Sequence, residues 1–521
     1  MEYDDIVVGA GSSGSVLAAR LSEDAARTVL VLEAGPAHSD EGADDLYDLT
    51  FALGAHDWGL AAMASGERQV PYPQGKVAGG GSAVNGALAL RGMPADYDHW
   101  ASLGNTQWSW GHMLPSFRRL EDDPLGPSEF HGTGGPVPIS RWSVDELAPV
   151  QLAFLDACHS LGIPDCPDLN DPRASGIGPW PMNRQGMRRI STNLGYLRPA
   201  RSRANLRLEP HAHVIRVLFD DWGRAVGVEF EQAGELRRAF AGQVILCAGA
   251  LQTPGILWRS GIGPADCLSD IGVPCRLDRP GVGRNLSEHA GSFLFFRPAD
   301  GMCRTDVPQY QLGARWTSPE SSEENDVILG LMSYWDLTSL PDLAAYVGAP
   351  LVFCMSAGVQ LPASRGRVSW PSADHRAAPQ VELNLCAEPA DRRAVAAGLR
   401  QCWEIANTDP LARYIAALAQ PDPAWLADDG ALDAYVAGSA TPWFHPAGTC
   451  RMGPASDSSA VVDQYCRVRG VDALRIVDAS IMPTIPRANI NLTCIAIGER
   501  AAELVKETKT VAVGGTEKGS A

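Results

Sequence analysis

The sequence predicts an α/β protein, α+β overall, in which a Rossmann-like domain is interleaved with a second domain built on an antiparallel sheet. Three observations predict this fold class. The chain opens on an apolar strand, a glycine turn, a helix and a second strand. Similar units recur near the middle and at the end of the chain. The segments between them are rich in Pro, Trp and Ser and contain short alternating stretches.

The first unit occupies about the first 35 residues. Residues Ile6 to Val8 are all apolar, as a strand buried on both faces of a parallel sheet requires. Val16, Leu17 and Leu21 follow at helical spacing, and "TVLVLEAG" predicts the second strand. This order predicts the opening of a doubly wound sheet.

Two later segments extend the same domain. An apolar strand from Val244 to Cys247 runs into a glycine turn and a helix, and "ALRIVDAS" predicts another strand near the C-terminus. Pro483 and Pro486 keep the next residues out of a helix, whereas the stretch ending in "GERAAELVKE" predicts a good one.

Composition excludes several classes of function. Lys and Arg number 43 against 61 Asp and Glu, and the net charge of −18 excludes a nucleic-acid partner, which needs a cationic face. The opening residues lack a signal sequence and no long apolar run predicts a membrane span, so we expect a cytoplasmic protein. The 12 cysteines are scattered without a C-x-x-C pair, and we expect no metal site.

"GAGSSG" places Gly9, Gly11 and Gly14 in a G-x-G-x-x-G pattern directly between strand and helix. The first glycine permits a tight turn, the second a close approach to a pyrophosphate, and the third close packing of helix on strand. Glu33 ends the second strand, where a carboxylate can bind a ribose hydroxyl. The pattern predicts dinucleotide binding but does not distinguish FAD from NAD.

"GKVAGGGSAVNG" contains three consecutive glycines, and such a backbone can lie flat against a planar ligand. Together with "GALQTPGILWRSGIG", "PGVGRNLSEH", "HPAGTCRMG" and the segment from "RIVDAS" onward, it gives five motifs in order. In these motifs the chain resembles the glucose–methanol–choline (GMC) oxidoreductases, which are FAD-dependent alcohol oxidases and dehydrogenases. It is most similar to their pyridoxine 4-oxidase-like, choline oxidase-like and 5-hydroxymethylfurfural oxidase-like branches.

The resemblance implies roles for individual residues. His445 takes the place of the family histidine that faces the reactive edge of the flavin, and Asn489 takes that of its partner. Val214 matches a valine at the adenine end. The positions expected to bind FAD are Gly9, Gly11, Ser12, Ser13, Gly14, Glu33, Ala34, Gly79, Gly80, Ser82, Asn85, Val214, Ala248, Gly249, Asp478, Ala479 and Asn491. Relatives that bind FAD covalently use a histidine where this chain has Val84, so we expect non-covalent FAD.

The expected domains are discontinuous. The FAD-binding domain comprises residues 1–40, 70–140, 186–300 and 441–510. The substrate-binding domain comprises residues 41–69, 141–185 and 301–440, and residues 511–521 are expected to be a disordered tail.

Alcohol oxidation needs a base for the hydroxyl proton, and the ordinary histidine pKa of about 6.5 suits that task. We therefore expect His445 to act as the base and the amide of Asn489 to position the alcohol oxygen. The alternatives are a hydroxynitrile lyase-like enzyme that binds FAD without net redox turnover and a protein that binds FAD only structurally. The expected partners are a small alcohol and O₂ or another electron acceptor; the alcohol and the oligomeric state do not follow from the sequence.

Several neighbouring residues are assigned plainer roles. Cys450 is expected to be a buried thiol and Arg451 an anchor of its turn. Trp443 and Phe444 fit either a pocket wall or the core. His211, His213 and His289 are expected to be structural or surface residues.

Overall fold

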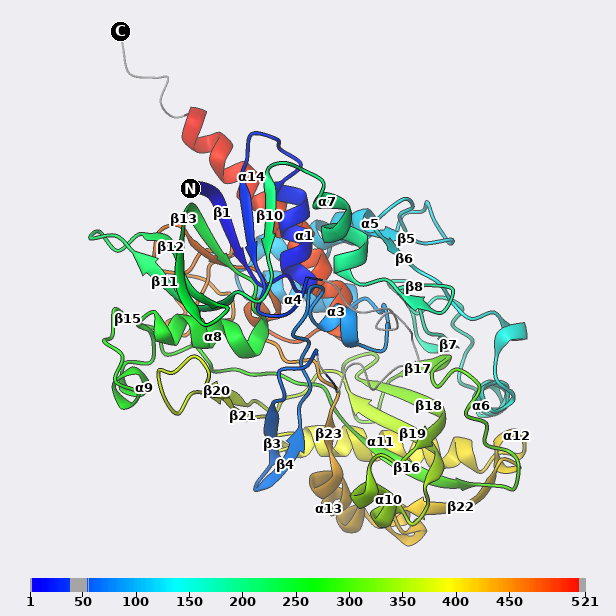
Figure 1. Cartoon of the computed structure of the whole chain (residues 1–521). Helices are drawn as coiled ribbons and strands as arrows, with labels where there is room; N and C mark the ends of the chain where they lie inside the picture. The colour runs from blue at the N-terminus through cyan, green and yellow to red at the C-terminus, as the bar shows by residue number, and fades with distance from the viewer. Residues whose placement is uncertain (1, 38–53, 55, 515–521) are drawn as a thin grey trace.

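A computed structural model describes residues 2–37, 54 and 56–514 of the chain, and its first large sheet contains the predicted Rossmann-like strands (Figure 1). Ile6 lies between Leu30 and Val244, and Val244 in turn pairs with Leu474, all in parallel. The strands run in the order β10-β2-β1-β13-β12-β11, with β24 also paired to β13. Their bounds are β1 Glu2–Val8, β2 Val29–Leu32, β10 Leu206–Glu209, β11 His213–Phe219, β12 Ala225–Gln232, β13 Glu235–Leu246 and β24 Leu474–Ile476.

Two helices from opposite ends of the chain pack side by side on this sheet, α1 (Ser12–Leu21) and α14 (Ile490–Gly514) (Figure 1). A Cβ atom on Gly498 would lie 2.8 Å from the carbonyl oxygen of Ser13, so the glycine permits this close approach. As predicted, the helix begins only after Pro486. α14 extends to Gly514, four residues into the expected tail, and residues 515–521 lie outside the described residues.

All strand pairs of the second large sheet are antiparallel, and most of its strands lie at the lower right of Figure 1. Its order is β22-β16-β19-β18-β17-β7, with β23 paired to β16, and α11 (Pro389–Ala406) packs against it. The strands are β7 Gly176–Pro179, β16 Ala290–Pro298, β17 Leu312–Trp316, β18 Val327–Asp336, β19 Leu351–Val359, β22 Ile415–Gln420 and β23 Thr441–Pro442.

Membership of this sheet departs from the expected domain limits. β16 lies before residue 300, within a span assigned to the FAD-binding domain, yet it pairs with β19 along its length. The alternating stretches "RGRVSW" and "PQVELNLC" form β20 (Arg367–Ser369) and β21 (Gln380–Glu382) as expected. They join β3 (Ala61–Ser65) and β4 (Arg68–Pro71) in a separate small sheet.

Shorter elements connect these layers. The helices are α3 Gly81–Val84, α4 Pro94–Ser102, η1 Thr106–Trp108, α5 Trp110–Leu120, η2 Val144–Glu146, α6 Pro149–Ser160, η3 Asn193–Leu197, α7 Arg198–Ala200, α8 Gly249–Arg259, α9 Ala265–Asp270, α10 Pro341–Val347, α12 Asp409–Ala412, η4 Pro423–Ala427, α13 Asp429–Ser439 and η5 Ala479–Ile481. The strands are β5 Glu121–Asp122, β6 Val137–Pro138, β8 Arg184–Gln185, β9 Arg188–Arg189, β14 Ile262–Gly263 and β15 Leu277–Asp278. Among the described residues, no helix combines the length and apolarity needed to cross a bilayer.

A buried arginine joins the antiparallel sheet to three other segments of the chain. Arg315 on β17 donates to the carbonyl oxygens of Leu169, Arg487 and Arg91, at 3.1, 2.8 and 2.7 Å. Its guanidinium is fully buried and burial lowers its pKa to about 10. Arg487 lies two residues before Asn489, so this contact links the antiparallel sheet to the C-terminal segment that carries Asn489.

Candidate active site

The first glycine turn is shaped for close contacts. Gly9 has a φ of +100°, and a Cβ atom there would lie 2.5 Å from the carbonyl oxygen of Cys247. A Cβ atom on Gly14 would lie 2.0 Å from the carbonyl oxygen of Gly9. A Cβ atom on Gly11 would have no neighbour closer than 4.0 Å, and no described side chain caps the N-terminus of α1. The helix therefore presents free N–H groups to an open side, which suits a pyrophosphate.

The second glycine loop meets the first. The amide of Gly79 donates to the carbonyl oxygen of Ala10 at 2.7 Å. A Cβ atom on Gly80 would lie 2.8 Å from Cα of Gly11, so only glycine permits this approach. Two segments about 70 residues apart in the sequence thus form one glycine-lined surface.

Glu33 ends β2 beside the first turn. Its carboxylate accepts hydrogen bonds from the backbone amides of Ala10 and Gly35, each at 2.8 Å. Burial raises the pKa of Glu33, although these amides favour the ionised form. Each oxygen keeps a lone pair for a ribose hydroxyl, and the neighbouring Ala34 is only half-buried.

Helix α14 contributes a polar side chain to the same place. Asn491 accepts a hydrogen bond from the Ser12 hydroxyl at 3.0 Å and is 8% exposed. Within the described part of the chain, its Nδ2 atom has no hydrogen-bond partner. A buried amide donor without a partner is costly, so Asn491 fits a polar ligand at this position. Ser13 differs, because its hydroxyl donates to the carbonyl oxygen of Cys494 and fastens α1 to α14.

Asp478 joins the start of α8 to η5. Its carboxylate accepts from the amide of Gly249 at 2.9 Å, the hydroxyl of Thr253 at 2.6 Å and the amide of Ser480 at 2.8 Å. The residues expected to contact the cofactor here, which include Ala248 and Ala479, are therefore held by an internal carboxylate. Burial raises the pKa of Asp478 against these hydrogen bonds.

Ser82 and Asn85 also make internal contacts. The buried Ser82 hydroxyl donates to the carbonyl oxygen of Gly79 at 2.6 Å and accepts from the amide of Thr192 at 3.0 Å. Oδ1 of Asn85 accepts from the amide of Ala87. The structure thus gives both side chains a role in shaping the glycine loop.

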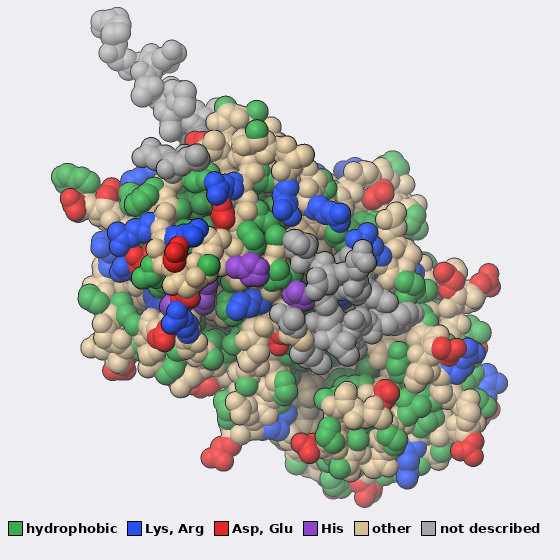
Figure 2. Space-filling model, viewed as in Figure 1, with side chains coloured by type: hydrophobic (Ala, Val, Ile, Leu, Met, Phe, Trp, Pro, Cys, Tyr) green, Lys and Arg blue, Asp and Glu red, His purple; other side chains and the backbone are tan. Residues whose placement is uncertain are grey.

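Val214 lies near the other end of this surface. The amides of His211 and Ala212 donate to the carbonyl oxygens of Gly35 and Glu33, which brings β11 beside the end of β2. An aromatic and cationic cluster surrounds the half-buried His213; its members are Trp58, Lys76, His213 and His375. Figure 2 shows histidine side chains among Lys and Arg side chains on this face. Two glycine loops, an uncapped helix and an unpartnered amide therefore fit FAD across one continuous surface.

His445 lies on the loop after β23 and is buried. Its Nε2 atom lies 3.1 Å from Nδ2 of Asn489, so the structure brings together the two residues expected to act. Its Nδ1 atom lies 2.9 Å from Nδ1 of His289, whose ring is fully buried. Burial and then His289 lower the pKa of His445 well below 6.5.

His289 and its neighbour Glu288 are site residues that sequence reasoning missed. His289 was expected to be structural or at the surface; it is not at the surface, and its ring meets the His445 ring edge-on at a centroid distance of 5.1 Å. The carboxylate of Glu288 accepts from the amide of His445 and from the Tyr72 hydroxyl. The sequence does place both residues at the end of the motif "PGVGRNLSEH", but nothing in the sequence indicates that this motif lies beside residue 445.

The aromatic residues before His445 have different surroundings. The Trp443 ring packs on Gly291 and Gly358, where Cβ atoms would approach it to 2.7 and 2.1 Å. Phe444 is 46% exposed and has a φ of +64°. Its ring packs against the Tyr72 ring at a centroid distance of 5.7 Å. Trp443 therefore belongs to the packing of the antiparallel sheet, while Phe444 is exposed in the turn next to His445.

Cys450 and Arg451 occupy the plainer roles expected of them. The Cys450 side chain is fully buried, and burial raises the pKa of its thiol well above the ordinary value. Such a thiol is not a nucleophile. Arg451 pairs with Asp457 at 2.6 Å and holds its own loop.

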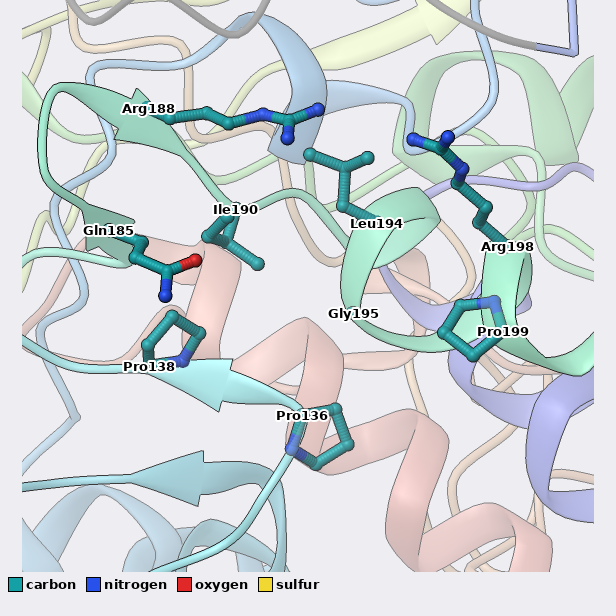
Figure 3. A pocket seen from close by; sticks show the side chains of 9 residues that line it. All are labelled: Pro136, Pro138, Gln185, Arg188, Ile190, Leu194, Gly195, Arg198 and Pro199. Carbon is teal, nitrogen blue, oxygen red and sulfur yellow. The ribbon is translucent and has the colours of Figure 1, made fainter.

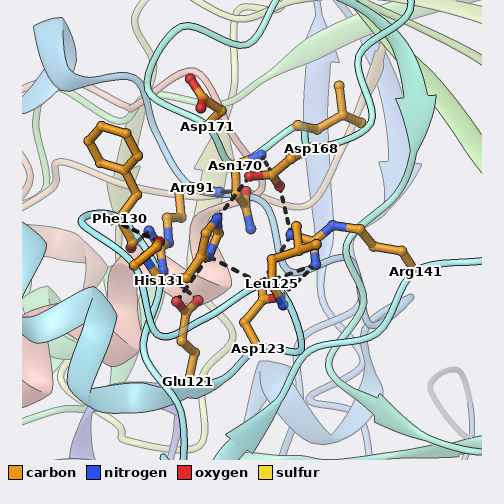
Figure 4. A network of polar contacts seen from close by, with 12 residues as sticks. Arg91, Glu121, Asp123, Leu125, Phe130, His131, Arg141, Asp168, Asn170 and Asp171 are labelled. Atoms are coloured by element: carbon orange, nitrogen blue, oxygen red, sulfur yellow. Dashed lines mark hydrogen bonds and ion pairs between the residues drawn. The ribbon is translucent and has the colours of Figure 1, made fainter.

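A second polar cluster contains three potential metal ligands, Glu121, Asp123 and His131 (Figure 4). Nδ1 of His131 lies 3.2 Å from Glu121 and its Nε2 atom lies 2.8 Å from Asp168. Burial opposes the charge on His131, but the hydrogen bonds to the three carboxylates raise its pKa to about 11. Arg141 donates to both Asp123 and Asp168, so the described hydrogen bonds and ion pairs join the cluster into one network.

A separate cavity of about 550 Å³ lies between β6, the β8–β9 hairpin and η3 (Figure 3). Its lining contains Arg188, Arg198 and Gln185 among prolines and aliphatic side chains. None of its lining residues belongs to the predicted site. The candidate active site therefore lies at the glycine loops and His445, and this cavity is a separate feature.

Family models described as GMC oxidoreductase match residues 3–291 and 362–498. The chain is 35% identical to the 5-(hydroxymethyl)furfural oxidase of Methylovorus sp. (strain MP688), over 96% of this chain and 98% of that protein. It is also 35% identical to the oxygen-dependent choline dehydrogenase of Burkholderia pseudomallei (strain 1710b), over 98% and 94%.

Among solved structures, the pyridoxine 4-oxidase from "Mesorbium loti" superposes with a TM-score of 0.90 at 30% identity, covering 97% of this chain and 99% of that one. These matches extend through both large sheets and both glycine loops. They confirm the resemblance predicted from the motifs. The chain belongs to the GMC oxidoreductases and is an FAD-dependent oxidoreductase of that family.

Proposed function

We propose that this enzyme oxidises a primary alcohol to an aldehyde, with His445 as the general base and Asn489 as the group that positions the alcohol oxygen. The observation that carries this proposal is the 3.1 Å contact between Nε2 of His445 and Nδ2 of Asn489. The ring nitrogen and the amide contact each other directly, so an alcohol hydroxyl that enters the point between them meets a proton acceptor and a hydrogen-bond donor.

An alcohol hydroxyl at that point would donate its proton to His445 and accept a hydrogen bond from Asn489. FAD, when bound, supplies the acceptor for the hydride that leaves the alcohol carbon. Loss of the proton strengthens hydride donation, because negative charge on oxygen weakens the C–H bond. The product is the aldehyde, and bound FAD would pass the two electrons on to O₂ or another acceptor.

The low pKa of His445 keeps its ring deprotonated and ready to accept a proton, and it also makes the ring a weaker base than an ordinary histidine. At neutral pH the ring is uncharged and one nitrogen carries a lone pair, so no deprotonation must precede the reaction. The residues that would hold FAD are the glycine loops, Glu33, Asn491 and the α8–η5 junction. Because Val84 offers no nucleophile, we propose that FAD is bound without a covalent link.

An anaerobic alcohol panel tests the proposal. The named relatives suggest choline, 5-(hydroxymethyl)furfural and pyridoxine as the first members. We expect at least one primary alcohol to bleach the flavin absorbance, and we expect air or an artificial acceptor to restore it. Cleavage of a hydroxynitrile without bleaching by any alcohol would instead favour the lyase-like alternative, which none of the named relatives supports.

A further inference from the structure

A continuous chain of polar contacts leads away from the catalytic pair into the antiparallel sheet. Nε2 of His445 contacts Asn489 at 3.1 Å, and its Nδ1 contacts Nδ1 of His289 at 2.9 Å. Nε2 of His289 lies 3.1 Å from the carbonyl oxygen of Gln360, just beyond the end of β19. Each of the two rings therefore has both nitrogens engaged.

The carbonyl oxygen of Gln360 sets the direction of the hydrogen bonds that join it to His289 and His289 to His445. A carbonyl only accepts, so Nε2 of His289 must carry a proton. Burial lowers the pKa of His289 to about 4, although the carbonyl groups of Gln360 and Pro486 favour protonation. The ring is therefore neutral above that pH, and its Nδ1 atom has a lone pair.

The same reasoning then applies to His445. Because Nδ1 of His289 accepts, Nδ1 of His445 donates and carries the proton of that ring. Its Nε2 atom is left with the lone pair, which accepts from the Asn489 amide until a substrate hydroxyl takes its place. The base function thus falls on the nitrogen that faces Asn489.

We propose that His289 is a positioning residue that selects the tautomer of His445 in which Nε2 is the base. This inference rests on the proposed function of His445 and adds a residue that touches neither alcohol nor flavin in that scheme. In the other tautomer Nε2 would carry a proton and point it at the alcohol oxygen. His445 could then accept nothing from the substrate.

The ring position of His445 does not depend on His289 alone. The amide of His445 is bound by Glu288, and the amide of Trp443 donates to the carbonyl oxygen of His289 at 3.0 Å. A side-chain substitution at 289 therefore leaves these backbone contacts in place. The other titratable groups around His445 are Glu288 and Tyr72, and neither contacts its ring nitrogens in the described hydrogen bonds.

Two substitutions at His289 distinguish the loss of its hydrogen-bond acceptor from a change in side-chain packing. His289→Leu removes the nitrogen acceptor, whereas His289→Asn keeps an oxygen acceptor near the position of Nδ1. We expect His289→Leu to slow anaerobic flavin reduction by on the order of 10²–10⁴-fold with a much smaller change in KM. We expect His289→Asn to stay within about tenfold of the parent, since it restores the direction of the hydrogen bond.

Tyr435→Phe is the control, because it removes a buried hydrogen bond to β16 at Phe293 without touching the His445 ring. The tautomer itself is read from ¹⁵N ring shifts of histidine-labelled holoenzyme, with His445→Asn identifying the signals of residue 445. We expect a protonated Nδ1 and a bare Nε2 in the parent, and loss of that preference in His289→Leu.

A bare Nδ1 on His445 in the parent would overturn the inference. Equal rates in His289→Leu and the parent would do the same. If His289→Leu does not fold, the parent spectrum and His289→Asn still decide. A failure of the proposed function would look different, because no alcohol would reduce the flavin of the parent enzyme, whichever tautomer of His445 the spectrum shows.

Discussion

The backbone amide of His445 donates to both carboxylate oxygens of Glu288, at 2.7 and 2.9 Å. The residue before it, Phe444, has a φ of +64°, a conformation that costs free energy for a non-glycine residue. Glu288 is buried and also accepts from the Tyr72 hydroxyl. The buried side chain of Glu288 thus fixes the backbone of the turn that carries His445.

Glu288→Gln is predicted to lower the free energy of unfolding by about 1–3 kcal/mol, because an amide replaces one acceptor oxygen with a donor. Flavin reduction by the best alcohol should also slow, since the turn relaxes. Chemical denaturation and anaerobic stopped flow measure the two effects. Glu404→Gln on the exposed side of α11 is the control, and it should stay within about 0.5 kcal/mol of the parent. Equal stability of both variants would contradict the prediction.

Glu33→Gln is predicted to weaken FAD binding by about 1–3 kcal/mol, roughly 5–150-fold in Kd, because a charged hydrogen-bond partner is lost. Gln keeps one acceptor for the amides of Ala10 and Gly35. Glu209→Gln at the end of the neighbouring β10 is the control and should retain FAD. Titration of the apoprotein with FAD gives both constants, and unchanged binding by Glu33→Gln would show that this carboxylate does not bind the ribose.

Non-covalent binding predicts that denaturation releases the flavin. Val84 at the end of α3 carries no nucleophilic atom, in contrast to the histidine of covalent relatives. After acid precipitation the yellow colour and flavin absorbance should appear in the supernatant. Flavin that stays with the pellet would show a covalent link through another residue.

The buried histidines predict two opposite limbs of stability against pH. The pKa of His289 is lowered to about 4, so its contribution is present above the unfolded value of about 6.5 and is lost as pH falls through 4. The shift corresponds to on the order of 3 kcal/mol. The pKa of His131 is raised to about 11, so its contribution is present below 6.5 and is lost as pH rises through 11.

Denaturant unfolding from pH 4 to pH 11 measures both limbs. His131→Asn should flatten the alkaline limb, and His289→Asn should reduce the acid limb, to which His445 and the carboxylates beside His131 also contribute. An alkaline limb that is unchanged in His131→Asn, or an acid limb that is unchanged in His289→Asn, would show that the assigned histidine does not set that limb.

The nucleotide-binding part of the fold could be predicted because its determinants are local. Gly9, Gly11 and Gly14 lie within six residues, and their steric role is visible from spacing alone. The late start of α14 followed from Pro483 and Pro486 in the same way. These predictions needed no knowledge of which distant segments meet.

The remaining features depend on contacts between distant segments. His289 and His445 are separated by 156 positions, and β16 carries no residue that marks it for the antiparallel sheet. A strand that is apolar on both faces fits a parallel or an antiparallel neighbour equally well. The contacts that join His445 to His289 and His289 to Gln360 can therefore be identified only once the folded sheet is known.

The last prediction concerns His445 itself. His445→Ala should retain FAD and slow flavin reduction by roughly 10²–10⁴-fold, the usual contribution of a positioned acid–base group. In the parent, kcat/KM should rise with pH through the pKa of this ring. Burial and His289 hold that pKa well below 6.5, so the rise ends before neutral pH.

His445→Ala should lose that rise, because no base titrates in its place. Asn489→Ala should slow reduction yet keep the rise, since it removes the amide that positions oxygen and leaves the base. Stopped-flow reduction across pH separates the two variants. A parental rate in His445→Ala would show that another group takes the hydroxyl proton. A profile that still rises in His445→Ala would place the titrating group elsewhere, and Glu288, whose pKa burial raises to about 8, would be the next residue to substitute.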